Sequence, residues 1–412
     1  MSSSEVSAAV PDEGTGLRSF MDEVFQAFQR SEQRRWAQAY LWALLHASGK
    51  KTPRSMALAT SLPPAAAHGL HQFINASPWD WAPVRHRLAR RVAETATPYA
   101  WTVAELLIPK RGEHSVGVHR RVDRVTGRTV NCQRALGLLL AAGGHCYPVD
   151  WSLVLGGGWN ADPERMRRAR IPAAEAGRTV ADHVVGYAAG VAAQPCLADL
   201  PWVLDLTRCD DAAGVLAGLA RHGVDVVCEV SPDQPVLADP HSPAVTTVRA
   251  LTQVRRARYT QVLLRHGPDG REVLRAVPVH AYAATVRVPG PGGVDGARAY
   301  RALERPDPQG RRPARYWLTT LTGRRVEDVL RLARGHTAAL TAVAALGRFG
   351  VLDFEGRSFP GWHHHMTMAS AAYVYRRLTR STGSVVPEPP HAPPDAPSCA
   401  PDPPGALTGA RN

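Results

Sequence analysis

Lysine is scarce in this chain of 412 residues. Only three of the 49 basic residues are lysines, namely Lys50, Lys51 and Lys110, and the others are arginines. A GC-rich genome explains part of that preference, because it exchanges lysine codons for arginine codons. Codon bias does not set the net charge, which is +13 with an isoelectric point near 10.0. Such a charge favours a polyanionic partner, most simply nucleic acid.

Several other signals are missing, and each absence excludes a class of protein. The six cysteines never stand in a metal-binding spacing such as C-x₂-C, which indicates reduced thiols in a cytoplasmic protein. No run of 18 apolar residues exists, so no membrane span is expected, and the N-terminal segment lacks the features of a signal peptide. The glycines at 156–158 lack the lysine of a phosphate-binding loop, which argues against a nucleotide cofactor. No G-x-S-x-G motif supports a serine hydrolase.

The chain divides into four parts by composition. Residues 1–15 are small and polar and are expected to be disordered, as is the proline-rich tail at 381–412. Residues 16–95 show apolar residues at three- and four-residue spacings, which predicts a helical region. From residue 96 to 380 the pattern changes to short apolar runs separated by helices. Strand-like pieces between Gly/Pro loops at about 245–320 indicate a β-rich insertion in this core.

The core reads as an α/β domain with a mixed sheet. Three strand-like runs come first, and they are followed by helix, strand, helix and strand, with a final strand and two closing helices after the insertion. The predicted strands span 101–109, 114–120, 131–145, 201–206, 224–230 and 315–321, and the predicted helices span 174–194, 210–222, 325–347 and 361–380.

Three adjacent histidines, His363, His364 and His365, suggest a metal site at first sight. Pro360 and Gly361 precede a run without further Pro or Gly, which predicts that the histidines begin a helix. Neighbouring residues on a helix point about 100° apart, so three of them do not converge on one ion. Helical histidine ligands need a spacing of four residues. A structural role or a phosphate contact is therefore favoured over metal binding.

Four strings in order along the chain resemble one branch of insertion-sequence transposases of the DDE superfamily. They are LHQFINASPWDWAPVRHRLARR (70–91), IPKRGEHSVGVHR (108–120), GRTVNCQ (127–133) and FEGRSFPGWHHHMT (354–367). The resemblance covers about residues 16–380. It implies a helical DNA-binding region at 16–95 and a ribonuclease-H-like catalytic core at 96–380. In that core, three carboxylates hold two Mg²⁺ ions about 3.5–4 Å apart for phosphoryl transfer.

The resemblance implies positions for the three carboxylates, and only some of them are acidic here. Asp205, at the end of the apolar string PWVLDL, matches the second carboxylate. The first falls at Ala104 or Glu105, so Glu105 is the candidate that could join Asp205 as catalytic residue and Mg²⁺ ligand. The third falls near Ala339, in a span from 329 to 352 that contains no acidic residue at all. The third ligand is therefore expected to be absent.

Two functions remain open. One is a transposase that cuts and joins DNA at element ends, and the other is a DNA-binding regulator without catalysis; the missing glutamate favours the second. Zinc binding by the histidine triplet is a remoter third. A bacterial cytoplasmic protein, associated with the nucleoid when bound to DNA, is expected, and whether it forms a homodimer is left open. The predicted DNA contacts are basic residues around the first long helix and within the family strings: Arg34, Arg35, Lys50, Lys51, Arg54, Lys110, Arg357 and His363.

Overall fold

The computed structural model describes residues 14–60, 62–122, 127–238, 244–254, 257–266, 273–290, 298–307 and 309–381. The two segments expected to be disordered therefore lie outside the described residues, apart from 14–15, which begin the first helix, and 381, which ends the last one.

The N-terminal region is helical, as its periodicity predicts. It contains α1 (Gly14–Val24), a 3₁₀ turn η1 (Phe25–Ala27), α2 (Ser31–His46), α3 (Pro53–Ala59), α4 (Ala66–Asn75) and α5 (Trp81–Thr95). Local capping explains two of the helix starts. Thr52 and Ser55 form a reciprocal capping box ahead of α3, with Pro53 in the first turn. The side chain of Asp80 accepts a hydrogen bond from the backbone N–H of Ala82 at the start of α5.

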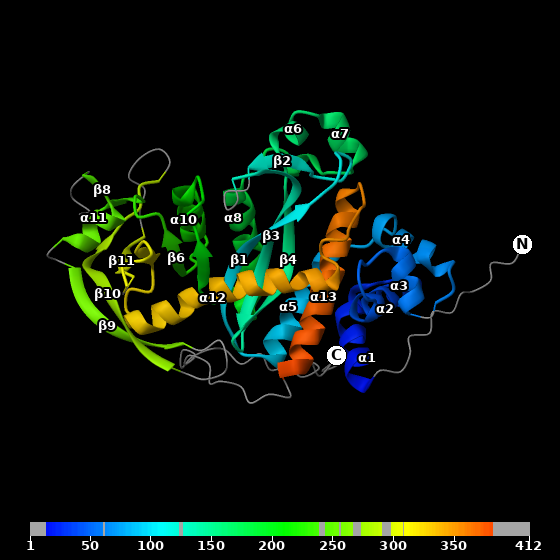
Figure 1. Ribbon diagram of the computed structural model, residues 1–412, viewed down its shortest axis with the longest axis horizontal. Coiled ribbons are helices and arrows are strands. Elements are labelled where there is room, and N and C mark those ends of the chain that lie inside the picture. Colours follow the sequence, from blue (N-terminus) through cyan, green and yellow to red (C-terminus); the bar gives the residue numbers. More distant parts are fainter. Residues whose placement is uncertain are drawn as a thin grey trace, which may run out of the picture.

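A large mixed sheet forms the centre of the molecule (Figure 1). Its strand order is β2-β3-β1-β5-β6-β12-β11-β10-β9, with β4 paired to β3. β1, β5 and β6 are mutually parallel, and the other pairs are antiparallel. The strands are β1 (Pro98–Pro109), β2 (His119–Val122), β3 (Thr129–Ala142), β4 (His145–Val154), β5 (Trp202–Asp205), β6 (Val226–Val230), β9 (Ala257–His266), β10 (Val273–Val286), β11 (Tyr300–Arg305) and β12 (Arg315–Thr319).

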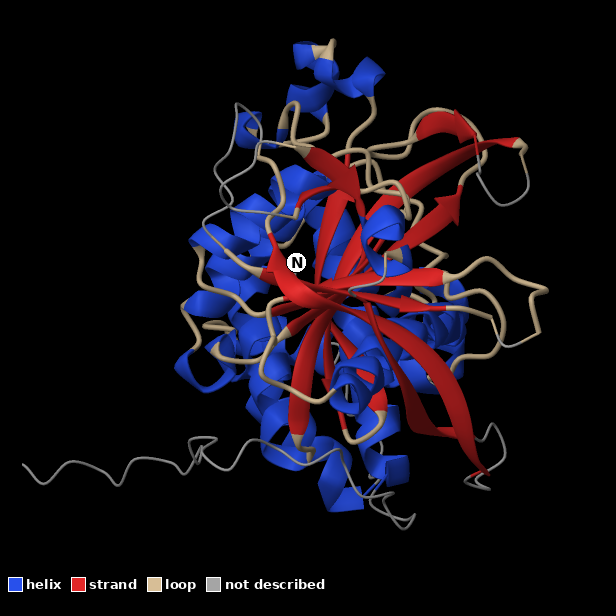
Figure 2. Cartoon of the chain, turned by 90° about the vertical axis from the view of Figure 1, so that its left-hand side faces the viewer, coloured by secondary structure: helices blue, strands red, loops and turns tan. Residues whose placement is uncertain are grey.

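The part of this sheet in the order β4-β3-β1-β5-β6, three antiparallel strands followed by two parallel ones, gives the expected mixed α/β core with flanking helices. The insertion extends the same sheet through β12, β11, β10 and β9, which Figure 2 shows as one continuous twisted layer. A separate two-stranded sheet pairs β7 (Pro235–Leu237) with β8 (Val245–Thr247), and α11 (Val248–Gln253) follows it.

Helices cover both faces of the sheet. On one face, which we call the α12 face, α12 (Val326–Ala345) and α13 (Phe359–Ser381) pack on the strands. There the indole N–H of Trp151 donates to Ser370 at 2.8 Å, and the Cys146 thiol donates to the carbonyl of Gly335. The opposite face, which we call the α8 face, carries α8 (Val180–Ala192). There Trp101 and Leu138 line a small cavity together with residues of that helix.

The remaining helices are short or connect consecutive core strands along the chain. α10 (Ala212–Arg221) connects β5 to β6, and its start is capped by the side chain of Asp211. α6 (Gly157–Asn160), α7 (Pro163–Arg168), the 3₁₀ turn η2 (Ala173–Glu175) and α9 (Pro195–Ala198) fill the connection from β4 to β5. The 3₁₀ turn η3 (Leu346–Phe349) follows α12.

Two strand predictions differ from the structure. The expected strand at 114–120 begins only at His119, because Gly112 and Gly117 adopt positive φ angles in the preceding loop. β4 was not predicted. The run 131–145 is a strand and a turn, in which Gly143 and Gly144, at φ 53° and 78°, allow the chain to reverse directly into β4. Two consecutive positive φ values are the signature of a tight hairpin turn, and the GG pair was the available signal.

α13 joins the N-terminal helices to the sheet. It packs against α2, α4 and α5 on one side and against β4 on the other, within one cluster of buried residues. His365 makes two of the buried polar contacts in this packing. His365 donates its Nε2–H to the carbonyl of Gly350 at 2.8 Å, and its Nδ1 accepts a hydrogen bond from the hydroxyl of Tyr40 on α2 at 3.0 Å.

We expect Tyr40→Phe to lower the free energy of unfolding by about 1–2 kcal/mol, because it leaves the buried Nδ1 of His365 without a donor. Urea denaturation monitored by tryptophan fluorescence measures the change. Tyr300→Phe is the matched control: that ring is also buried, but its hydroxyl makes no hydrogen bond to the described residues. Equal effects of the two substitutions would contradict a specific role for the Tyr40 contact.

Candidate functional site

Asp205 is the last residue of β5, a central strand next to β1. Its Oδ1 accepts hydrogen bonds from the backbone N–H of Thr207 at 2.9 Å and from the Thr207 hydroxyl at 2.6 Å, which fixes the carboxylate at the strand end. Its Oδ2 lies 3.7 Å from Nε2 of His336 on α12. Asp205 therefore points to the α12 face, and a third of its side chain is exposed there.

The residue beside Asp205 on β1 is Ala104. β1 and β5 pair in parallel with Trp101 beside Trp202 and Thr102 beside Val203, and the same register continued by two residues places Ala104 beside Asp205. Paired residues on adjacent strands point to the same face of a sheet, and successive residues point to opposite faces. Ala104 is accordingly on the α12 face and Glu105 is on the α8 face.

Glu105 has partners of its own on the α8 face. One oxygen accepts a hydrogen bond from Arg121 of β2 at 3.0 Å, and the other accepts from Nε of Arg134 on β3 at 2.7 Å. Two guanidinium groups thus neutralise the carboxylate from neighbouring strands. The structure does not bring Glu105 and Asp205 together, because the pleat of β1 turns Glu105 away from the face that Asp205 occupies. This placement corrects the expectation that the two carboxylates share a site.

The third expected position lies on α12. Ala339 is fully buried, and it stands about one helical turn beyond His336. The acidic residues of α12, Glu327 and Asp328, are both in its first turn. At the predicted position the helix presents a methyl group to its neighbours instead of a carboxylate.

A different carboxylate lies next to Asp205. Glu229 of β6 pairs directly with Asp205 in the parallel register, so both point to the α12 face. Glu229 is already occupied, because Arg315 of β12 contacts both of its oxygens, with 2.6 Å between Nε and Oε1. Burial lowers the pKa of the neighbouring His336, although the carboxylates of Asp205 and Glu229 act in the opposite direction.

This donor set does not fit a pair of Mg²⁺ ions, which require several oxygen ligands in octahedral geometry. The strand and helix positions flanking Asp205 are Ala104 and Ala339, and Glu229 is held by a guanidinium group. Across the part of the chain that the structure describes, no group of three His, Cys, Asp or Glu side chains is arranged to hold a metal ion.

The three histidines of α13 point into three separate buried environments. His363 stacks on Trp81, and its Nδ1 accepts a hydrogen bond from Arg85 at 3.1 Å. His364 stacks on Trp79, with its ring nitrogens each 2.8 Å from a backbone carbonyl, of Ile74 and Trp79. His365 binds Tyr40 and Gly350 as described above. The helix separates the rings as its periodicity predicts, and their contacts hold the N-terminal helices in place.

Burial makes these histidines hard to protonate. It lowers the pKa of His364 and of His365 to about 4, although hydrogen bonds to backbone carbonyls raise both values. Burial and the positive charge of Arg85 lower the pKa of His363 further. Since the side chain of His363 is only 5% exposed, it offers no contact to a phosphate in this structure, contrary to its predicted role in DNA binding.

The predicted basic contacts separate into two groups. Lys51 is buried and donates to the carbonyl of Ala47, and Lys110 donates to the carbonyls of Leu352 and Phe354. Burial lowers the pKa of Lys110 to about 8. These two lysines anchor the 350–354 loop and are poorly placed for DNA. The others have exposed side chains, although Lys50 is paired with Glu355: Arg34, Arg35, Lys50, Arg54 and Arg357.

Sequence reasoning missed four residues that define this site. Glu229, Arg315 and His336 surround Asp205, and the buried Arg85 holds the histidine helix. They lie far apart along the chain and belong to no common motif. Only the register of the strands brings the first three together, so no local sequence signal could have identified them.

Comparison with known proteins supports one family. A family model described as DDE superfamily endonuclease matches residues 23–287, more than half of the chain. A search of curated proteins found no match. The matched segment includes Ala104 and Asp205 and ends before α12. Among the described residues, no helix is long and apolar enough to cross a membrane.

We expect the stability of the protein to fall as the pH is lowered from 6.5 towards 4. His364 and His365 have a folded pKa of about 4 and an ordinary value of 6.5, so the unfolded chain binds more protons within this window. With His363 included, the slope approaches about 4 kcal/mol per pH unit if all three titrate only on unfolding. Urea denaturation at a series of pH values measures it.

The variant that checks the source of this slope is His365→Gln, which should be less sensitive to pH than the parent protein. His86→Gln is the control, because His86 is exposed on α5 and should leave the slope unchanged. A parent protein whose stability is constant between pH 6.5 and 4.5 would refute the assignment of neutral buried histidines.

Proposed function

The chain belongs to the DDE superfamily of endonucleases, and on that basis we propose that it binds double-stranded DNA but has lost metal-dependent cleavage. Members of this superfamily cut DNA with divalent metal ions held by carboxylates. The proposed protein is a transposase-derived DNA-binding factor that acts on the nucleoid of a bacterial cytoplasm.

One observation carries the proposed loss of catalysis. Asp205 faces α12 with Ala104 beside it on β1 and with no carboxylate on the covering segment of the helix. A site with one of three ligands binds at least one metal ion weakly. It also lacks the charge that positions the attacking or leaving oxygen, an effect worth several kcal/mol of barrier. The neighbouring Glu229 does not replace a ligand, because its oxygens bind Arg315.

The charge of the chain supports the proposed DNA binding. The net charge is +13, and the family model that matches it describes enzymes acting on nucleic acid. Arg34 and Arg35 on α2 and Arg54 on α3 are exposed, and none of them has an acidic partner within the described residues. Guanidinium groups of this kind contact phosphates without reading sequence.

We expect the purified protein to bind double-stranded DNA with an affinity that falls steeply between 50 and 200 mM salt. Several phosphate contacts release bound counterions, and a protein with six or more contacts loses about 10³-fold in affinity over this range. Fluorescence anisotropy with a labelled duplex measures the dependence. Absence of binding at 50 mM salt, or binding that salt does not weaken, would refute the proposal.

We further expect no nicking or strand transfer by the protein with Mg²⁺ or Mn²⁺ on any DNA that it binds. Supercoiled plasmid and labelled element ends are the substrates, and Asp205→Ala is the matched control. Cleavage that is present in the parent and lost in Asp205→Ala would show an intact active site and favour a functional transposase.

The double variant Ala104→Asp/Ala339→Glu tests the geometry: it should be destabilised without metal and gain stability in Mn²⁺.

A further inference from the structure

Two arginines face each other across the β11–β12 hairpin. Arg305 ends β11 and Arg315 begins β12, and the antiparallel register pairs them directly. Directly opposed residues point to the same face. Both guanidinium groups lie over the ring of Trp317, with their Cζ atoms 5.5 Å and 5.1 Å from its centroid, and Trp317 itself is buried. The hairpin therefore holds two like charges on one aromatic platform.

This arginine pair lies towards the same end of the sheet, along the strand direction, as Asp205, which ends the central strand β5. Glu229 pairs with Asp205 on one side and with Trp317 on the other, so all three residues point to the α12 face. Arg315 is thus two strands from Asp205 and Arg305 is three strands away, roughly 10 Å and 14 Å at ordinary strand spacing. The positive charge of Arg334 on α12 contributes to lowering the pKa of Arg305.

We propose that Arg305 and Arg315 form a binding site for a backbone phosphate of DNA, on the same face of the sheet as Asp205. The proposal rests on the DNA binding proposed above and names the surface that would carry part of it. A planar guanidinium group binds phosphate oxygens through two parallel hydrogen bonds, and two groups at a fixed separation select that chemistry.

The charge balance of the cluster is unfavourable without an anion. Arg315 is neutralised by Glu229, but Arg305 has no ion-pair partner within the described residues. Asp307 follows β11 in the same hairpin, and its Oδ2 accepts hydrogen bonds from the backbone N–H groups of Arg311 and Arg312. Burial and the positive charge of Arg315 lower the pKa of Arg305, although the carboxylates of Glu229 and Asp307 act in the opposite direction. A bound phosphate would relieve this repulsion.

The hairpin loop extends the positive surface. Arg311 and Arg312 have exposed side chains, and the two hydrogen bonds from their backbone to Asp307 hold the loop in a defined shape. A duplex that crosses this edge would meet Arg311 and Arg312 first and the arginine pair next. The occupant is therefore a phosphodiester backbone, and an isolated diphosphate is the alternative that the experiment separates.

The test compares the parent protein with Arg305→Gln in two titrations, one with a fluorescent duplex and one with inorganic pyrophosphate. Arg305 is chosen because Arg315→Gln would leave the carboxylate of Glu229 unpaired. Arg221→Gln is the matched control. It removes one exposed arginine from the end of α10. This position precedes the start of β6, whereas Glu229 and the arginine pair lie near the end of β6.

We expect Arg305→Gln to bind the duplex about tenfold more weakly at 50 mM salt and to reduce the slope of log affinity against log salt by about 1. Arg305→Lys, which keeps the charge and loses the paired hydrogen bonds, should retain the slope and lose part of the affinity. Arg221→Gln should match the parent. Thermal unfolding should show no loss of stability in Arg305→Gln, because the substitution removes a repelled charge.

The outcomes separate this inference from the proposed function. One outcome is that the parent protein binds DNA and that Arg305→Gln has the same affinity and salt slope as the parent or as Arg221→Gln. This outcome overturns the phosphate site and leaves DNA binding intact. A parent that binds no DNA but binds pyrophosphate through Arg305 supports the phosphate site and refutes the proposed function. Binding of neither ligand refutes both.

Discussion

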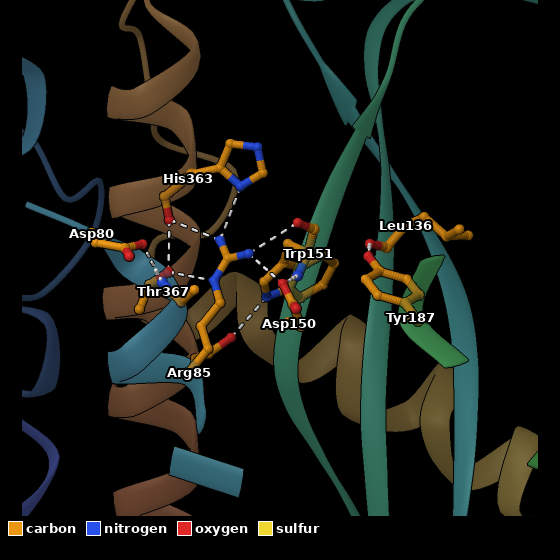
Figure 3. Close-up of polar contacts among 10 residues, drawn as sticks. Asp80, Arg85, Leu136, Asp150, Trp151, Tyr187, His363 and Thr367 are labelled. Atoms are coloured by element: carbon orange, nitrogen blue, oxygen red, sulfur yellow. Dashed lines mark hydrogen bonds and ion pairs between the residues drawn. The ribbon is translucent and has the colours of Figure 1, made fainter. Parts of the chain in front are cut away.

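The buried guanidinium group of Arg85 is the interaction on which the arrangement of this molecule depends. An arginine has five N–H donors, and all five are used here. Nε donates to Thr367, Nη1 donates to the Asp150 carboxylate and the Trp151 carbonyl, and Nη2 reaches His363 through its ring nitrogen and its carbonyl (Figure 3). A buried charge is tolerated only when it is paired and hydrogen-bonded in this way. One side chain thereby joins α5, β4 and α13.

The histidine segment belongs to this scaffold. His363 accepts from Arg85, and its two neighbours close the contacts of α13 with α2, α4 and the loop after α12. The packing of the N-terminal helices therefore requires this segment, whether or not the protein cuts DNA. That explains how a chain can keep the FEGRSFPGWHHHMT string while the helix before it carries alanine at the position of the expected carboxylate.

The sequence predicted the long helices, most of the core strands and Asp205 at a strand end, because these depend on local periodicity and on turn residues; the short helices α6, α7, α9 and α11 were not predicted. The sequence also shows that α12 has no acidic residue beyond its first turn, which needs no exact register. The role of Glu105 could not be decided in the same way. Adjacent residues on a strand face opposite sides, so Ala104 and Glu105 were exclusive alternatives, and only pairing with β5 shows which one accompanies Asp205. The burial of His363 and Lys51 is likewise a tertiary property.

The electrostatics around Asp205 connect the proposed loss of the metal site to the proposed phosphate site at the arginine pair. Three carboxylates in one pocket repel each other and are stable only with cations between them, which metal ions supply in an active enzyme. Here two of the three positions are alanine, and the carboxylates that remain, Asp205 and Glu229, face His336 and Arg315. The protein therefore supplies a cation of its own here, the guanidinium group of Arg315. Arg305 lies beside Arg315 over Trp317, so under the proposed function the same surface offers guanidinium groups to a phosphate where an intact site would hold metal ions.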